Sequence, residues 1–382
     1  MASSPTLRDV HHQPSWRIAS DRVEAFLTET GGMLGPVTFD YQGRKIQPLS
    51  VAPWHGEKLD RATPSLLKVL RGDFFCVPFG GNATPYKGEH HPPHGETANA
   101  NWTRPALLQT PQSVTFECSL KTRARPLEVT KNITLRTGHD FVYQTHLIEG
   151  GAGRMSFGHH PMLAFPDKPG SGIVSTSPFA FGQVCPVPFE NPAEGGYTSL
   201  RPGAEFDSLE HVPTLTGGAA DVSRYPARDG FEDLVMMLAD PSLTLGWTAV
   251  ALPRERYAWF SLKNPAKLPG TVLWLSNGGR HYAPWNGRHR RVMGLEDVNS
   301  YFHFGLAESA KKNPLSDMGR KTCVTLNPRK PTVVRYGFGV AELPAGFDRV
   351  TRIQPNDAGT AVTLLADSGK TATASIDLDS VL

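Results

Sequence analysis

Short segments in which apolar and polar side chains alternate recur along most of this chain. They lie at 16–20, 23–30, 34–39, 113–120, 127–135 and 141–148. A period of two is typical of a strand with one buried face. Glycine (37 residues) and proline (33 residues) are frequent between these segments, and the best helical candidate, 299–312, is short. The sequence therefore predicts an all-β, mostly antiparallel fold with few short helices.

The length of 382 residues suggests two domains on average, but β-rich architectures often form larger single units. No repeat and no clear linker divides the chain. We therefore expect one domain over 1–382. Within it, 1–15 is a polar arm, and strands in 344–382 complete or extend the sandwich.

The net charge of +3 is too small to indicate a nucleic-acid partner. No apolar run reaches the roughly 18 residues of a membrane span. The first 15 residues contain no apolar signal core, so a cytoplasmic location is expected. The four cysteines are far apart, which argues against a disulfide framework or a cysteine-based zinc site. We expect a monomer or homodimer with a small-molecule ligand.

An acidic pair, Glu296 and Asp297, closes the apolar segment 292–295 directly after a loop rich in Arg, Trp and Tyr. A carboxylate near a strand end, beside such groups, is a candidate general base. For an isolated glutamate the reading as a surface carboxylate is more common. Neighbours on a strand face opposite ways, so only one of the two acids can face a pocket.

Two histidine motifs lie upstream. His160 precedes Pro161, which favours an extended backbone and displays the side chain from a strand end. His159 is its rival for the same reason of alternation. His94 lies in a loop with His90 and His91, a cluster that resembles a metal-ligand set. The intervening prolines scatter these side chains, so we expect no metal and a loop that lines a polar pocket.

These motifs, in this order, resemble the aldose 1-epimerase (galactose mutarotase-like) family. The similar segments are VEAFLTETGGMLGPVTF, PPHGETANANW, GHHPML, DGFEDLVMM, MGLEDV and TLNPRKPTVVRYGF, and together they span roughly 16–340. The resemblance implies a galactose mutarotase-like β-supersandwich and no cofactor. It also implies interconversion of the α and β anomers of a free sugar.

By this resemblance Glu296 is the base that takes the proton of the C1 hydroxyl. His160, kept protonated by a neighbouring carboxylate, is the acid at the ring oxygen, and His94 stabilises charge there. Further residues are expected to bind the substrate: Arg71, Asn82, Trp102, Asp233, Arg280 and Trp285. Arg71 takes the place of the family's Arg-Asn-Arg signature, because this chain has Phe-Gly-Gly-Asn at 79–82.

Three alternatives remain open. The first is a non-catalytic carbohydrate-binding protein on the same fold. The second is an epimerase for phosphorylated or acidic sugars, in which Arg280, Arg288, Arg290 and Arg291 clamp an anion. The third is a glycoside hydrolase that pairs Glu96 with Glu296. Solvated or acid-paired arginines are the simpler reading of the second pattern.

Overall fold

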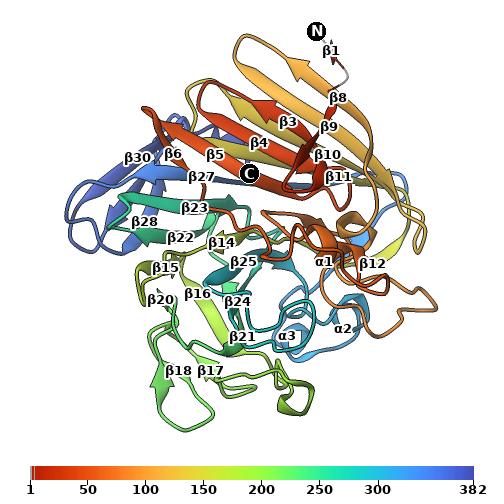
Figure 1. Cartoon of the computed structure of the whole chain (residues 1–382), viewed down its shortest axis with the longest axis vertical. Coiled ribbons are helices and arrows are strands. Elements are labelled where there is room, and N and C mark those ends of the chain that lie inside the picture. The colour runs from red at the N-terminus through yellow and green to blue at the C-terminus, as the bar shows by residue number, and fades with distance from the viewer. Residues whose placement is uncertain (1, 4) are drawn as a thin grey trace.

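The computed structural model describes residues 2–3 and 5–382. Antiparallel sheets dominate it, and Figure 1 shows the two largest sheets crossing the middle of the molecule. The largest sheet has ten strands, in the order β1 (Ala2–Ser3), β8 (Thr103–Gln109), β9 (Ser113–Lys121), β10 (Glu128–Arg136), β11 (Phe141–Glu149), β27 (Thr332–Glu342), β23 (Tyr257–Lys263), β22 (Gly246–Leu252), β15 (Gly172–Thr176) and β20 (Arg224–Tyr225).

A second sheet has eight strands and carries the features described below. Its order is β17 (Glu205–Phe206), β16 (Phe179–Val184), β21 (Phe231–Ala239), β24 (Gly270–Asn277), β25 (Val292–Asn299), β13 (Phe157–His159) and β7 (Phe75–Cys76), with β14 (Met162–Ala164) also paired to β25. A third sheet has five strands, all from the first part of the chain: β2 (Leu7–Val10), β3 (Gln13–Ala19), β4 (Val23–Thr28), β5 (Leu34–Tyr41) and β6 (Arg44–Ile46).

The smaller sheets are β28 (Val350–Pro355) with β29 (Ala361–Ala366) and β30 (Thr371–Ser375), β12 (Gly153–Met155) with β26 (Val324–Leu326), and β18 (Val212–Pro213) with β19 (Ala219–Ala220). The helices are α1 (Ser65–Val69), α2 (Leu306–Ala310) and α3 (Pro314–Asp317), with 3-10 turns at Glu96–Ala98, Pro192–Glu194 and Leu378–Ser380. The prediction of an all-β, mostly antiparallel chain with few short helices is thus confirmed.

The helix expected at 299–312 is mostly absent. Strand β25 continues to Asn299, and only α2 is helical in that range. Phe302 and Gly305 have φ values of 47° and 122°, which an α-helix cannot include. The N-terminal residues expected as a polar arm contain β2 and the start of β3.

The C-terminal strands β28–β30 form a separate sheet. Their apolar side chains, among them Val362 and Leu364, pack in one buried cluster with Trp247 and Phe260 from β22 and β23. In Figure 1 this sheet lies at the edge of the molecule, beside the ten-stranded sheet. The other face of the ten-stranded sheet therefore remains for the main core.

The eight-stranded sheet has two buried faces, and this positions the candidate site. Val235 and Leu273 belong to the main core shared with the ten- and five-stranded sheets. Their neighbours Leu234 and Trp274 belong to a second cluster on the opposite face. Because side chains alternate along a strand, even-numbered residues of β21, β24 and β25 lie on this second face.

Candidate active site

A cavity of about 200 Å³ lies against the second face of the eight-stranded sheet. The strands supply Leu234, Trp274 and Glu296, and loops and α1 supply the remaining walls. The lining residues are Leu66, Leu67, Leu70, Phe74, His94, His160, Phe189, Leu234, Trp274, Arg280, Trp285, Glu296 and His303. Five of the nine residues predicted for the site therefore meet in one place.

Glu296 and His160 form the polar centre of this cavity. The Nε2 atom of His160 lies 3.2 Å from Oε1 of Glu296, and both side chains are almost fully buried. The ring of Phe74 stacks on the imidazole at a centroid distance of 4.5 Å. Stacking on the ring face and the contact of the carboxyl group with Nε2 at the ring edge fix the orientation of His160.

Burial shifts the pKa values of this pair in opposite directions, because a buried site disfavours both charged forms. It raises the pKa of Glu296 well above its usual value and lowers the pKa of His160 to about 4. The expectation that a carboxylate keeps His160 protonated near neutral pH is therefore wrong. When the pair holds one proton, burial favours the arrangement in which Glu296 carries it and both groups are neutral.

His94 lies beside the pair, with its ring centroid 5.0 Å from that of His160. Its Nδ1 atom is 3.4 Å from Sγ of Cys76. Burial raises the pKa of Cys76 well above its usual value, so this group remains a thiol and its S–H can donate to Nδ1. In that tautomer the ring proton of His94 is on Nε2; in the other tautomer Nδ1–H donates to Sγ and the S–H donates to the Phe74 carbonyl oxygen at 3.9 Å. Burial also lowers the pKa of His94 well below its usual value, so the ring is neutral.

The two rivals face the opposite side of the sheet. Nδ1 of His159 contacts Asp73 at 3.1 Å, and its ring stacks on Tyr336 at 4.1 Å. Asp297 pairs with Lys263 and accepts hydrogen bonds from the hydroxyls of Ser261 and Thr271. Both groups belong to the packing between the two large sheets.

Arg280 and Trp285 line the cavity, as expected. The guanidinium lies 4.5 Å from the Trp285 ring centroid and 5.3 Å from that of Trp274. Its Nε donates to Glu190 at 2.6 Å. Burial disfavours the charged guanidinium and by itself would lower the pKa of Arg280. The negative charges of Glu232 and Glu190 have the larger combined effect and raise this pKa.

The other arginines of this loop are paired elsewhere. Arg288 contacts Glu57, Arg290 contacts Asp229, and Arg291 contacts Asp167. None of the three lines the cavity. The simpler reading of the arginine-rich loop, in which most members pair with acids, agrees with these contacts.

Asp233 does not reach the cavity. It accepts hydrogen bonds from the hydroxyls of Thr198 and Ser199 and from two backbone N–H groups. Its neighbour Glu232 is on the cavity side of β21, where it accepts from Nε1 of Trp274 at 2.8 Å. Burial raises the pKa of Glu232 to about 7. Asp233 and Glu232 thus lie on opposite faces of β21, and neither lines the cavity.

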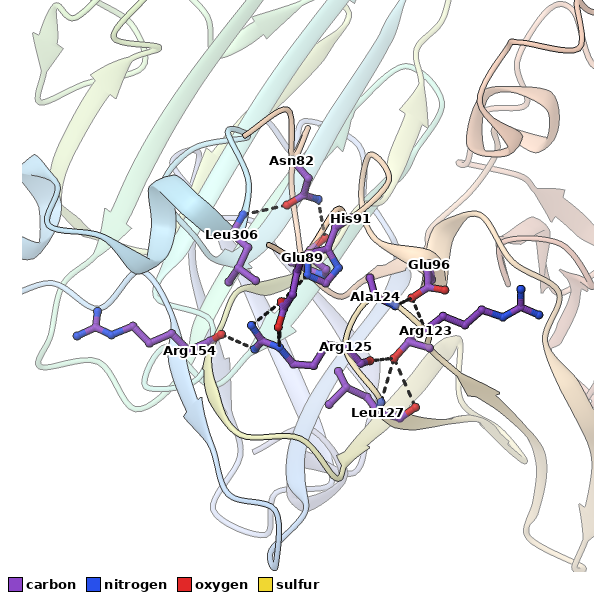
Figure 2. A network of polar contacts seen from close by, with 12 residues as sticks. Asn82, Glu89, His91, Glu96, Arg123, Ala124, Arg125, Leu127, Arg154 and Leu306 are labelled. Carbon is purple, nitrogen blue, oxygen red and sulfur yellow. Dashed lines mark hydrogen bonds and ion pairs between the residues drawn. The ribbon is translucent and has the colours of Figure 1, made fainter. Parts of the chain in front are cut away.

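Three other predicted substrate-binding residues are structural. Arg71 is fully buried and donates to the carbonyls of Val69, Val10 and His11. The indole of Trp102 donates to the Thr97 carbonyl. Asn82 connects two loops by bonds to Gly80, Pro92 and the N–H of Leu306 (Figure 2).

The histidine loop does not gather metal ligands. His91 bonds Glu89, which also pairs with Arg125 (Figure 2). His94 lines the cavity instead. Glu96 accepts from the backbone N–H groups of Arg123 and Ala124 and does not line the cavity with Glu296. Among residues 2–3 and 5–382, no group of three or more His, Cys, Asp or Glu is arranged to hold a metal ion.

Several residues that line the cavity were not predicted from the sequence. His303 follows β25, Phe189 lies in the loop-rich region 165–230, and Leu66, Leu67 and Leu70 come from or follow α1. None lies in a periodic segment or a motif. Only the tertiary fold brings them to the strand ends.

Sequence comparison identifies no matching family model and no matching curated protein. Solved structures do match. A candidate aldose 1-epimerase from Klebsiella pneumoniae superposes with a TM-score of 0.61 at 14% identity, covering 89% of this chain and 82% of that one. A galactose mutarotase-like protein from Clostridium acetobutylicum gives 0.58 at 12%, covering 90% and 99%. A candidate aldose 1-epimerase from Escherichia coli K12 gives 0.55 at 13%, covering 86% and 99%.

The chain has the galactose mutarotase-like fold. At these identities the likeness is one of fold, so the chemistry of the cavity has to be argued from its own residues. None of the helices within residues 2–3 and 5–382 is long and apolar enough to cross a membrane.

Proposed function

We propose that this protein is an aldose 1-epimerase-like isomerase that interconverts the α and β anomers of a free sugar. The observation that carries the proposal is the buried contact of 3.2 Å between His160 and Glu296 at the wall of the cavity. A pair of this kind can accept one proton and donate another without a cofactor. The names of the matching structures, which include mutarotases and aldose 1-epimerases, support the same reaction.

The proposed reaction starts from the single proton that the pair holds. Its transfer from Glu296 to His160 generates a carboxylate and an imidazolium. The carboxylate takes the proton of the C1 hydroxyl while the imidazolium protonates the ring oxygen, and the C1–O bond of the ring breaks. Rotation about C1–C2 and closure on the other face reverse both transfers, so the pair ends with one proton again. His94, as a neutral Nε2–H donor, stabilises charge on the ring oxygen.

The remaining walls suit a sugar ring. Trp274, Trp285 and Phe189 offer aromatic faces for its C–H groups. Arg280 offers N–H groups to hydroxyls, with its own charge balanced by Glu190. A non-catalytic carbohydrate-binding protein would need these walls but not the paired Glu296 and His160.

The direct test is the rate at which a pure anomer equilibrates. Freshly dissolved α-anomers of hexoses, pentoses and deoxy sugars are followed by polarimetry or NMR with and without the protein. Acceleration of at least one sugar, proportional to protein concentration, is the expected result. A useful control is Glu149→Gln, which alters an exposed carboxylate at the end of β11. Sugar binding without acceleration would contradict the proposed reaction.

The pH dependence of kcat/KM is expected to be bell-shaped. As the pH falls toward the His160 pKa of about 4, both members of the pair become protonated and the base is lost. As the pH rises through the raised pKa of Glu296, the shared proton is lost and no acid remains. Polarimetry of anomer equilibration across pH 3–10 measures this profile. An acidic limb near the ordinary histidine value of 6.5 would contradict the buried, coupled pair.

A further inference from the structure

The cavity offers few hydrogen-bonding groups for a sugar. Its polar side chains are Glu296, His160, His94, His303 and Arg280. The other eight lining residues are apolar: Leu66, Leu67, Leu70, Phe74, Phe189, Leu234, Trp274 and Trp285. Aromatic faces stack on sugar rings, but leucine side chains give a hydroxyl group no partner.

The reaction itself occupies most of the polar groups. Glu296, His160 and His94 would contact O1 and the ring oxygen. Arg280, His303 and the indole N–H of Trp285 then remain as the side-chain groups for every other hydroxyl of the sugar. Three of the side chains predicted to bind the substrate, Asp233, Asn82 and Arg71, are absent from the cavity because they are bonded to other parts of the chain.

Three leucines at α1 form one apolar wall of the cavity. Leu66 and Leu67 lie on α1 and Leu70 directly follows it. Leu66 and Leu70 are 6% and 4% exposed, so the sheet and loops hold them in place. A hydroxyl placed against this wall would lose its hydrogen bonds to water and gain none.

The charges of the cavity also restrict the ligand. Arg280 is the cationic lining residue, and its Nε is bound to Glu190. His94, His160 and His303 are held neutral, because burial lowers the pKa of each. The surroundings therefore provide no unbalanced positive charge for a phosphate or carboxylate group.

From these observations we infer that the substrate of the proposed isomerase is an uncharged, partly deoxygenated sugar, in which the leucine wall contacts a methyl or methylene group instead of a hydroxyl-bearing carbon. This inference rests on the proposed function and specifies its substrate class. Arg280, His303 and the indole N–H of Trp285 would bind the hydroxyls that remain.

The test compares sugars that differ at one carbon. The pairs are galactose with 6-deoxygalactose, mannose with 6-deoxymannose, glucose with 6-deoxyglucose and glucose with 2-deoxyglucose. Glucuronic acid and glucose 6-phosphate represent the charged classes. We expect the best substrate to be a deoxy sugar, with kcat/KM about 10- to 100-fold above its own parent, the range that a misplaced hydroxyl in an apolar pocket allows.

A variant of the wall provides the second arm. Leu67 is only partly buried, so Leu67→Asn is expected to fold, which a thermal melt verifies. The amide gives a hydroxyl a partner, and the preference for the deoxy sugar is expected to fall several-fold. Thr63→Asn, at the half-buried position just before α1 and outside the cavity lining, is the matched control and is expected to leave the preference unchanged.

The failure of this inference can be told apart from failure of the proposed function. Calorimetric binding of the same panel to Glu296→Gln measures preference without turnover. Tighter binding of a deoxy sugar than of its parent supports the inference even if no anomer equilibration is seen. Equal or better binding and turnover of the parent, or of a charged sugar, overturns it. Binding of none of the sugars overturns both proposals.

Discussion

Glu296→Gln is expected to lower kcat for anomer interconversion by about 10²–10⁴-fold, the contribution of one positioned acid–base group. The amide has nearly the shape of the carboxyl group but can neither release nor accept a proton. Burial raises the pKa of Glu296, so the folded protein favours the neutral form of this group, which the amide resembles. The substitution is therefore expected to leave the unfolding midpoint almost unchanged, which separates loss of chemistry from loss of structure.

His160→Gln is expected to cause a loss of similar size, and the double variant is the informative measurement. Since the two groups exchange one proton and lie 3.2 Å apart, either single substitution disables the same step. The double variant should be no slower than the slower single variant, because groups that act as a unit are not additive. Additive losses, or a Glu296→Gln enzyme within threefold of wild type, would show that the base lies elsewhere.

The largest expected effect on stability comes from Lys263→Met. Lys263 and Asp297 form an ion pair between the two large sheets, with side chains 1% and 0% exposed. Removing one partner leaves a buried charge without its counterion, which costs about 3–5 kcal/mol in other proteins. Urea or guanidinium unfolding of the variant against wild type measures the loss.

Two further variants make this prediction specific. Lys263→Met combined with Asp297→Leu removes both charges and is expected to recover most of the lost free energy of unfolding. Lys45→Met breaks an exposed pair with Asp40 and is expected to change the free energy of unfolding by at most about 1 kcal/mol. A Lys263→Met loss as small as that of Lys45→Met would mean that water reaches the buried pair.

The strands were predictable because alternation is a local property of the sequence. Strands β9 and β10 bury every second side chain in the structure, as their sequences indicate. That Glu296 and His160 meet in one cavity was predictable from short motifs that fix both the residue and its strand. Which of two adjacent polar residues lies on the cavity face depends on which face of the sheet packs against the main core. The sequence of β21 alone does not contain that information.

The errors at other positions have the same physical origin. Arg71 carries a charge and was expected at a polar site, but three backbone carbonyls satisfy it inside the protein. Those carbonyls come from two distant parts of the chain, at 10–11 and 69. Conversely, Phe189 and His303 occur in segments without periodicity, so nothing local marks them as neighbours of Glu296.

The adjacent polar pairs at 159–160, 232–233 and 296–297 restrict how this protein can change over time. In each pair the two side chains point to opposite faces of the sheet. His160 and Glu296 line the cavity and Glu232 accepts a hydrogen bond from the lining residue Trp274, while the other member of each pair lies between the sheets or in a loop contact. A single-residue insertion or deletion in β25 would exchange the two roles, moving Glu296 toward Lys263 and Asp297 into the cavity. Laboratory evolution of this site should therefore proceed through point substitutions and changes in loop length, because strand indels lose the fold and the chemistry together.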